Sequence, residues 1–425
     1  MLFHESSPLA ANPDAVVVSA ADRERLLKLA DQVAELAARP MEQEKRELWY
    51  RHNALEDGRA LVFCDPENSW HEIIPEESLG CDGELARGWE FRLRKEVFWG
   101  RQMCDDRVIL PYFDVPHVYS VTGWGVDVGF VGGEDGGAYR WDSPIRSDAD
   151  VERLHRPEII VDAALTDRVL GAAHDVFDGV LEVRLRTKWW WSLGLTWNLA
   201  AWRGLQSLMF DMVDNPELVH RIMRVLCDGV MGTLDRLETG GFLAPNNDGS
   251  YVGSGGFGWT TELPDAGADG SVRCRDMWGF AESQETVGIS PDMFEEFVFP
   301  YQNAILERFG LNCYGCCEPL DARWRVVKRF PRLRRISVSP WANRAFMAEM
   351  LGNSYVYSMK PNPSELAMPE FDEERIRAGL RRDLDAARGC VVEVIMKDTH
   401  TIHNDPSRVT RWVQIAKEEA ERVPA

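Results

Sequence analysis

The feature that most constrains the fold of this chain is the alternation of short strands and helices in its last third. Four short runs rich in Val, Ile and Tyr, separated by segments with helical spacing, cover residues 311–315, 335–338, 355–359 and 391–396. Strands that are joined through helices pair in parallel by right-handed crossovers. Four such units in series predict an α/β fold, a closed (β/α)8 TIM barrel, with an open doubly wound sheet as the alternative.

The chain before these units predicts an N-terminal helical extension over residues 1–58, followed by one barrel domain over residues 59–425. Apolar positions recur at helical spacing over 20–38, and a second helix is expected over 42–54. One barrel can occupy the rest, since such domains commonly run past about 250 residues. Elsewhere we expect helices over residues 82–103, 163–177 and 216–239, strands over 60–64, 108–110 and 180–186, and a Gly-rich loop or hairpin over 123–137.

Composition narrows the class of protein. The net charge of −21 argues against nucleic acid and anionic membranes, because phosphate binding needs Lys and Arg clusters that the sequence does not contain. No apolar run approaches the about 20 residues of a membrane span, and the first 20 residues lack the order of a signal peptide. Nine cysteines in a chain this long do not form a disulfide framework. We therefore expect a cytoplasmic protein with reduced thiols.

In a barrel, the residues that carry chemistry lie on the loops that follow the C-terminal ends of the strands. The predicted strands therefore select a small group of polar candidates from the whole chain. These candidates are Asp65, Glu67, Asn68, Cys316, Cys317, Glu318, Ser339, Lys360, Asp398 and His400.

The segment at residues 312–321 is the most specific of these features, because it puts thiols and a carboxylate at a strand end. Thiolate, carboxylate and imidazole groups are the ligands that zinc prefers, and a catalytic zinc site uses three protein ligands and leaves one position open. Cys316 is the first choice for a ligand and Cys317 the second, because adjacent strand residues face opposite sides. Packing is the alternative, because free cysteine is a common buried residue.

The loop at residues 396–406 follows the last predicted strand and contains Asp398 and His400. A histidine on such a loop is a candidate metal ligand or general acid/base. Asp398 beside it is a candidate proton donor. The alternative for this loop is capping of the last helix by a nearby Thr, Asn or Asp side chain, which leaves the histidines in solvent. Capping does not exclude a role for His400.

The tryptophans are a third feature. The chain has 16 of them, more than a core of this size needs, and tryptophan stacks well on planar molecules. Trp191 and Trp278 are therefore candidates for the wall of a substrate pocket, with core packing as the alternative for each. Polar residues at 282–285 either line the same pocket or form a solvated turn. Walker-type and dinucleotide-binding motifs do not occur, which argues against kinase and hydride-transfer chemistry.

Three segments resemble the uroporphyrinogen decarboxylase superfamily. Residues 290–301, SPDMFEEFVFPY, match that superfamily's SPE-x-F-x-x-F-x-x-PY run, and DNPELV at 214–219 matches one of its helix starts. A Cys-bearing strand end and a last loop that ends in DPSRV at 405–409 follow in the same order. The resemblance covers residues 200–425 and implies a (β/α)8 barrel enzyme.

Two branches of that superfamily differ in their motifs. Its decarboxylases carry an Arg-rich RQAGRY stretch that holds substrate carboxylates, and nothing like it occurs near residues 50–68. Its corrinoid-linked methyltransferases bind zinc through a His-x-Cys at a strand end and a third ligand, usually Cys, in the final loop. In this chain the His-x-Cys falls on Tyr314 and Cys316, and the final-loop ligand falls on His400. Cys316 therefore keeps the family's first thiolate ligand. Tyr314 stands where the family has the histidine ligand, and His400 stands where it has the final-loop cysteine.

The methyltransferase branch is the closer of the two. It implies a zinc-dependent methyltransferase of the demethylase type, which moves a methyl group from a small O- or N-methylated compound to a corrinoid on a partner protein or to a similar acceptor. Zinc would act as a Lewis acid on the leaving group. A homodimer is a further expectation. The resemblance places metal ligands at Cys316 and His400, with Cys317 or Glu318 to complete the set. From the residues themselves, the candidates for catalysis are His400, Glu318 and Asp398, and those for the substrate are Asp65, Glu67, Asn68, Trp191, Trp278 and Tyr314.

Two alternatives stay open. In a metal-free decarboxylase or lyase of the same superfamily, His400 and Asp398 donate protons, and an arginine such as Arg203 meets the carboxylate of a small substrate. The second alternative is a non-catalytic barrel that only binds a ligand. In that case the replacement of the family's metal ligands reflects the loss of catalysis. Bound metal separates the methyltransferase hypothesis from both alternatives.

Overall fold

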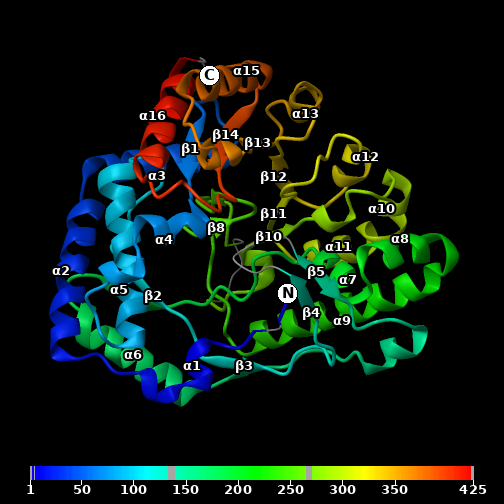
Figure 1. Ribbon diagram of the computed structural model, residues 1–425, viewed down its shortest axis with the longest axis horizontal. Helices are drawn as coiled ribbons and strands as arrows, with labels where there is room; N and C mark the ends of the chain where they lie inside the picture. The colour runs from blue at the N-terminus through cyan, green and yellow to red at the C-terminus, as the bar shows by residue number, and fades with distance from the viewer. Residues whose placement is uncertain (1, 4, 133–138, 265–269, 423–425) are drawn as a thin grey trace.

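The computed structural model describes residues 2–3, 5–132, 139–264 and 270–422 (Figure 1). Its main sheet contains six parallel strands, and helices lie around the outside of the molecule (Figure 1). Five of these strands are buried at every residue, as expected for a parallel sheet covered on both faces. In spatial order the strands are β1 (Leu61–Cys64), β14 (Val391–Met396), β13 (Val356–Met359), β12 (Leu333–Val338), β11 (Leu311–Tyr314) and β10 (Trp278–Ala281).

A second parallel sheet contains only two strands, β2 (Tyr112–Val115) and β7 (Glu182–Leu185). Strand β7 confirms the strand expected over 180–186. Among the described residues, no hydrogen-bonded ladder joins this pair to either edge of the six-stranded sheet. The fold is therefore a mixed α/β architecture with two parallel sheets, and a closed barrel stays a prediction.

One predicted strand is wrong. Residues 108–110 are not in a strand, and β2 begins only after Pro111. The reason is local, since the backbone N–H of Ile109 donates to the Glu42 carboxylate at 2.8 Å instead of to a neighbouring strand. The Gly-rich segment 123–137 contributes one strand of an antiparallel pair, in agreement with the hairpin alternative, and its residues 133–137 lie outside the described part of the chain. The remaining strands form antiparallel pairs, β3 (Tyr119–Val121) with β6 (Ile159–Val161), β4 (Gly129–Gly132) with β5 (Tyr139–Asp142), and β8 (Tyr251–Val252) with β9 (Gly256–Phe257).

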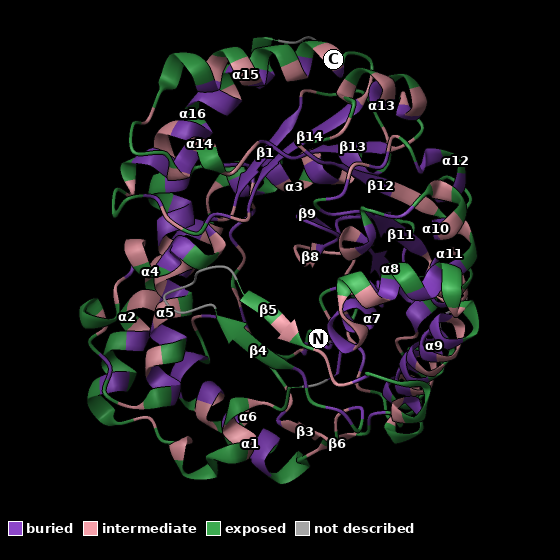
Figure 2. Cartoon of the chain, turned by 45° about the vertical axis from the view of Figure 1, so that its right-hand side comes forward, coloured by how far each residue is buried: buried purple, intermediate pink, exposed green. Residues whose placement is uncertain are grey.

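Most of the helices bury one face toward the interior and expose the other (Figure 2). The expected helices over 163–177 and 216–239 are confirmed, and that over 82–103 ends earlier and continues as a π-helical turn (Trp99–Met103). No helix in the described ranges is long and apolar enough to cross a bilayer. The helices are α1 (Pro8–Ala11), α2 (Ala20–Ala37), α3 (Pro40–Asn53), α4 (Trp70–Ile73), α5 (Glu84–Phe98), α6 (Ala163–Phe177), α7 (Thr196–Arg203), α8 (Leu205–Asp214), α9 (Pro216–Thr239), α10 (Pro291–Phe297), α11 (Phe299–Leu306), α12 (Trp324–Val327), α13 (Arg344–Leu351), α14 (Ser364–Ala367), α15 (Glu373–Ala386) and α16 (Ser407–Arg422).

A charged network lies inside the main sheet. Glu393 of β14 and Arg335 of β12 are both buried, and Arg335 Nε is 3.0 Å from Glu393 Oε1. The other carboxylate oxygen accepts a hydrogen bond of 3.1 Å from His52 Nε2, at the end of α3. Burial opposes the ionisation of Glu393, but Arg335 and His52 outweigh it and bring its pKa to about 2. Helix α3 thus contacts the interior directly. The predicted division at residue 58 stays a prediction.

Replacing the buried carboxylate tests the contribution of this network. Glu393→Gln is expected to lower the free energy of unfolding at pH 7 by about 3–5 kcal/mol, because Arg335 stays buried without its counter-ion. Urea denaturation of both proteins measures this, with the exposed Glu374→Gln as control.

The same pair of proteins has an expected pH dependence. Because the folded pKa of Glu393 is about 2 and the ordinary value is 4.5, its contribution is complete above pH 4.5 and is lost as the pH falls toward 2. The stabilities of wild type and variant should therefore converge over that window. A difference that stays constant down to pH 2 would contradict the role assigned to the ion pair.

Candidate active site

Two loops bring thiols and a carboxylate together. Cys316 and Cys317 follow β11, and Asp398 follows β14, so all three lie beyond the C-terminal ends of parallel strands. Gly315 starts the first loop with φ +91°, where a Cβ would lie 2.7 Å from the Leu320 side chain. Only glycine combines that backbone conformation with that close approach. The sharp turn releases Cys316 and Cys317 from the alternation of a strand, so their thiols lie on the same side.

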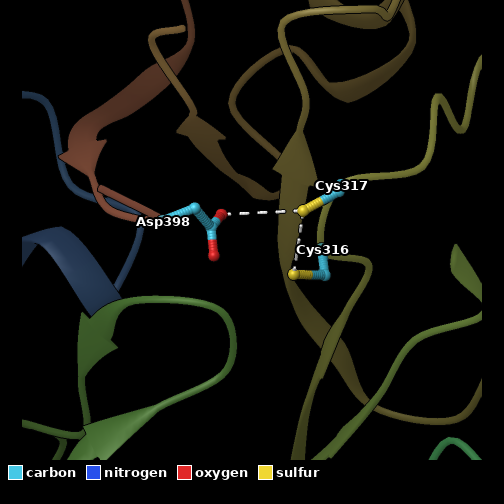
Figure 3. Close-up of side chains that lie close together, drawn as sticks. All are labelled: Cys316, Cys317 and Asp398. Carbon is cyan, nitrogen blue, oxygen red and sulfur yellow. Dashed lines mark hydrogen bonds between the residues drawn. The ribbon is translucent and has the colours of Figure 1, made fainter. Parts of the chain in front are cut away.

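The three side chains form a compact cluster (Figure 3). The sulfur atoms of Cys316 and Cys317 are 3.6 Å apart, and Cys317 Sγ is 3.6 Å from Asp398 Oδ2. One donor atom from each residue lies within 4.8 Å of the other two. Cys316 is buried, Cys317 and Asp398 are reached by solvent, and the Ser254 hydroxyl donates to Cys316 Sγ at 3.2 Å. The cluster therefore has a closed side and an open side.

Lys397 supplies positive charge to this cluster. Its ammonium nitrogen is 3.3 Å from Asp398 Oδ1 and 3.4 Å from Glu67 Oε1. Burial opposes the protonation of Lys397, but the surrounding acidic groups outweigh it and raise its pKa. The hydrogen bond from Cys317 and the charge of Lys397 lower the pKa of Cys316, against the effect of burial. The pKa of Cys317 is raised, first by its hydrogen bond to Cys316. One thiolate shared between two sulfurs is the state that this arrangement favours.

The loop after β1 holds the backbone of the loop after β14 in place through a hydrogen bond. Glu67 has φ 47° and its Oε2 accepts the backbone N–H of Asp398 at 2.8 Å. Asp65 Oδ1 accepts the Glu67 N–H at 3.0 Å and the Trp70 indole N–H at 2.7 Å. Burial raises the pKa of Glu67. In the structure these two carboxylates support the position of Asp398, and their predicted contacts with substrate stay predictions.

Two predicted metal ligands lie outside the cluster of Cys316, Cys317 and Asp398. Glu318 is buried, and its carboxylate accepts the backbone N–H groups of Ser283 at 2.8 Å and of Cys316 at 2.9 Å. It thereby ties the loop after β10 to the loop after β11. His400 is exposed, with its Nδ1 3.2 Å from the amide nitrogen of Asn68. The metal-binding and catalytic roles of Glu318 and His400 stay predictions.

The aromatic candidates divide between an open cavity and the core. Trp191 and Trp278 line a cavity of about 400 Å3, and Lys397 lies 5.4 Å from the centre of the Trp191 ring. This contact connects the cavity with the cluster of Cys316, Cys317 and Asp398. Tyr314 instead lies in the core, where its hydroxyl donates to Gln302 Oε1 at 2.8 Å. Burial raises the pKa of Tyr314 far above its ordinary value, so the hydroxyl stays protonated.

Four residues that the structure places in this region were not among those selected from the sequence. Lys397 directly precedes Asp398, and the strand end that selected Asp398 would have selected it too. Lys188 directly precedes the three consecutive tryptophans at 189–191 and lines the cavity. Tyr251 belongs to β8 and Ser254 to the turn that follows it, and the Gly-rich sequence there gives no positive indication of a site.

Comparison with known proteins adds little to these observations. A scan against models of protein families gives no match, and a search of curated protein sequences gives none either. Among solved structures, the chain is similar to a methyltransferase from Methanosarcina mazei, with 11% sequence identity and a TM-score of 0.36. The similarity covers 63% of this chain and 72% of that chain. A likeness at this TM-score does not bear on the function of the chain.

The position of the Glu318 carboxylate leads to a test of its structural role. Glu318→Ala leaves two backbone N–H groups without an acceptor, which is expected to cost about 1–3 kcal/mol for each group that stays buried. Glu318→Gln keeps one acceptor oxygen and should lose less. Urea denaturation measures both, with the exposed Glu349→Ala as control. Equal stability of Glu318→Ala and wild type would show that the carboxylate does not hold the two loops.

Proposed function

We propose that the chain is a zinc-dependent methyltransferase of the demethylase type, with zinc held by Cys316, Cys317 and Asp398. The observation that carries the proposal is the convergence of these three donor groups at the ends of β11 and β14, beside an aromatic cavity. The resemblance of residues 200–425 to the zinc-dependent, corrinoid-linked branch of the uroporphyrinogen decarboxylase superfamily supports it.

The donor set fits zinc. Thiolate sulfur and carboxylate oxygen are ordinary zinc ligands, and three protein ligands leave one tetrahedral position for a substrate. The sulfur atoms of Cys316 and Cys317 are 3.6 Å apart. Two sulfurs that bind one tetrahedral zinc at about 2.3 Å are separated by about 3.8 Å, so little movement is needed. The positive charge of Lys397 offsets the repulsion among the anionic ligands.

The residues around the cluster have separate tasks. Bound zinc supplies a Lewis acid for the ether oxygen or amine nitrogen that loses its methyl group. Lys397 holds Asp398 in place and keeps Cys316 in its thiolate form. Glu67 fixes the backbone of Asp398, and Glu318 fixes that of Cys316. Trp191 and Trp278 provide flat apolar surfaces that orient a planar compound and exclude water. The methyl group would pass to a reduced corrinoid on a partner protein or to a similar acceptor.

The proposal includes the closed (β/α)8 barrel. The two parallel sheets together contain eight strands, and their sequence order is β1, β2, β7, β10, β11, β12, β13 and β14. Placing β2 and β7 between the edges formed by β1 and β10 would give a closed cylinder in which each strand neighbours the next one in sequence. All observed pairings within both sheets are parallel, which supports this arrangement.

The decarboxylase alternative has less support. It relied on an arginine such as Arg203 to meet a substrate carboxylate. Arg203 is engaged elsewhere, since its guanidinium donates to both carboxylate oxygens of Asp211 and to the carbonyl of Ile145.

Metal content and methyl transfer test the proposal. Protein supplied with zinc is expected to retain about one ion per chain, and Cys316→Ser and Cys317→Ser to lower zinc affinity by at least about 100-fold, since even residues behind the ligands change it by 10–100-fold. Elemental analysis after dialysis measures this. Cys390→Ser is the matched control, because Cys390 lies at the opposite end of β14. His400→Ala and Asp398→Ala in the same series decide which of the two completes the site.

The catalytic part of the test uses reduced cobalamin as acceptor. Methylcobalamin should form from a methylated phenol or amine with wild type and Cys390→Ser, and not with the two site variants. Wild type that binds no zinc, or zinc binding that survives Cys316→Ser unchanged, would overturn the metal site. Bound zinc without methyl loss from any such compound would overturn the methyltransferase assignment.

A further inference from the structure

Lys188 lies in the wall of the aromatic cavity, and the proposed methyl transfer does not use it. Its ammonium nitrogen is 5.0 Å from the centre of the Tyr251 ring, and its side chain is reached by solvent through the cavity. The other cations of the wall are engaged by the protein. Arg186 pairs with Asp248 at 2.6 Å, and Arg92 donates to a backbone carbonyl at 2.9 Å.

Lys188 itself has no hydrogen bond or ion pair with any residue in the described ranges, and its ammonium nitrogen lies over the ring of Tyr251. Burial and the charge of Lys397 lower the pKa of Lys188. The charges of Asp65 and Glu67 act in the opposite direction, but the net shift is downward, so they do not fully offset burial and the charge of Lys397. An anionic group of a ligand in the cavity would supply the missing negative charge.

Tyr251 provides a second unpaired group at the same place. Its hydroxyl oxygen is buried and has no hydrogen-bond partner among the described residues, although buried hydroxyls are nearly always paired. Burial raises the pKa of Tyr251, so the hydroxyl keeps its proton and can donate it. A ligand oxygen is the kind of acceptor that this hydroxyl requires.

The walls between these polar groups are aromatic. Trp190, Trp191, Trp278 and Phe280 line the cavity, and the rings of Trp191 and Phe280 pack edge to face with centroids 5.3 Å apart. Trp191 also contacts Lys397, which in turn contacts Asp398 of the proposed zinc site. The apolar surface therefore extends from Lys188 toward the thiols, which suits a flat ring with a charged group at one end.

We propose that the cavity binds an aromatic carboxylic acid, with the carboxylate at Lys188 and the ring between the tryptophans and Tyr251. Under the proposed function, on which this part rests, the transferable methyl group is carried on an oxygen or nitrogen of the same ring. The substrate class is then a methoxylated or N-methylated aromatic acid rather than a neutral ether or an aliphatic amine.

Ligand binding tests the proposal without requiring methyl transfer. The probes are 3- and 4-methoxybenzoate and the matching methoxybenzamides, which have the same shape without the charge. Titration of zinc-supplied full-length protein, followed by tryptophan fluorescence and calorimetry, is expected to show at least one of the acids binding about tenfold or more tightly than its amide, as a charge-assisted hydrogen bond requires.

Variants of Lys188 test whether this residue causes the difference in affinity between the acid and its amide. Lys188→Met should remove the preference for the acid and leave amide binding unchanged, while Lys188→Arg should keep much of it. The exposed Lys328→Met is the matched control. Unchanged zinc content and near-ultraviolet circular dichroism show that each variant is folded, and the comparison of acid with amide on wild type needs no variant.

The outcomes separate this inference from the proposed function. No binding of either acid, equal binding of acid and amide, or full acid preference in Lys188→Met would overturn the carboxylate subsite, whatever the enzyme does with methyl groups. Acid binding that depends on Lys188, together with no methyl transfer to cobalamin, would support the subsite and overturn the methyltransferase assignment.

Discussion

The parallel pairing of the strands is the constraint on which the whole site depends. Because β1, β11 and β14 run in the same direction, their C-terminal ends lie along one edge of the main sheet. The loops that follow them carry Glu67, the two cysteines and Asp398, which are separated by more than 300 residues at the extremes of the sequence. Gathering so many groups of negative charge is costly in a partly buried region. Lys397 offsets this cost, and it contacts Glu67 and Asp398 directly.

A second set of buried charges lies within the strands β12 and β14 and directly after β13. Lys360 donates to Ser358 Oγ at 2.6 Å, and Ser358 donates to Glu393, which pairs with Arg335. Burial lowers the pKa of Lys360 to about 8, although Glu393 opposes that effect. The interior thus contains two clusters of charged residues, one with Lys397 as its cation and the other with Arg335 and Lys360. Such a core is held by specific pairings as well as by apolar burial, and this fixes the strands that carry the loops of the site.

The sequence predicted most of what depends on local pattern. Strand β14 begins and ends where its apolar run does, and the helices over 163–177 and 216–239 were found at both ends, because composition and helical spacing mark them. Strand β10 was missed, since Trp278-Gly279-Phe280-Ala281 is short and lies between polar residues that suggest a turn. The orientation of Glu318 could not be predicted either. It is decided by the backbone N–H of Ser283, which belongs to a different loop and is brought near only by tertiary packing.

One wall of the cavity and the thiol-bearing loop follow strands of different sheets. Lys188 and Trp191 lie after β7, which is paired with β2 outside the six-stranded sheet, whereas Cys316, Cys317 and Asp398 follow strands within it. Trp191 is the link between them, since its ring contacts Lys397 beside Asp398. Wall residues that do not contact Lys397 can therefore change during evolution with little effect on the cysteines and Asp398. Under the proposed function, a lineage built on this scaffold can change the compounds that it accepts while it keeps the same reactive centre.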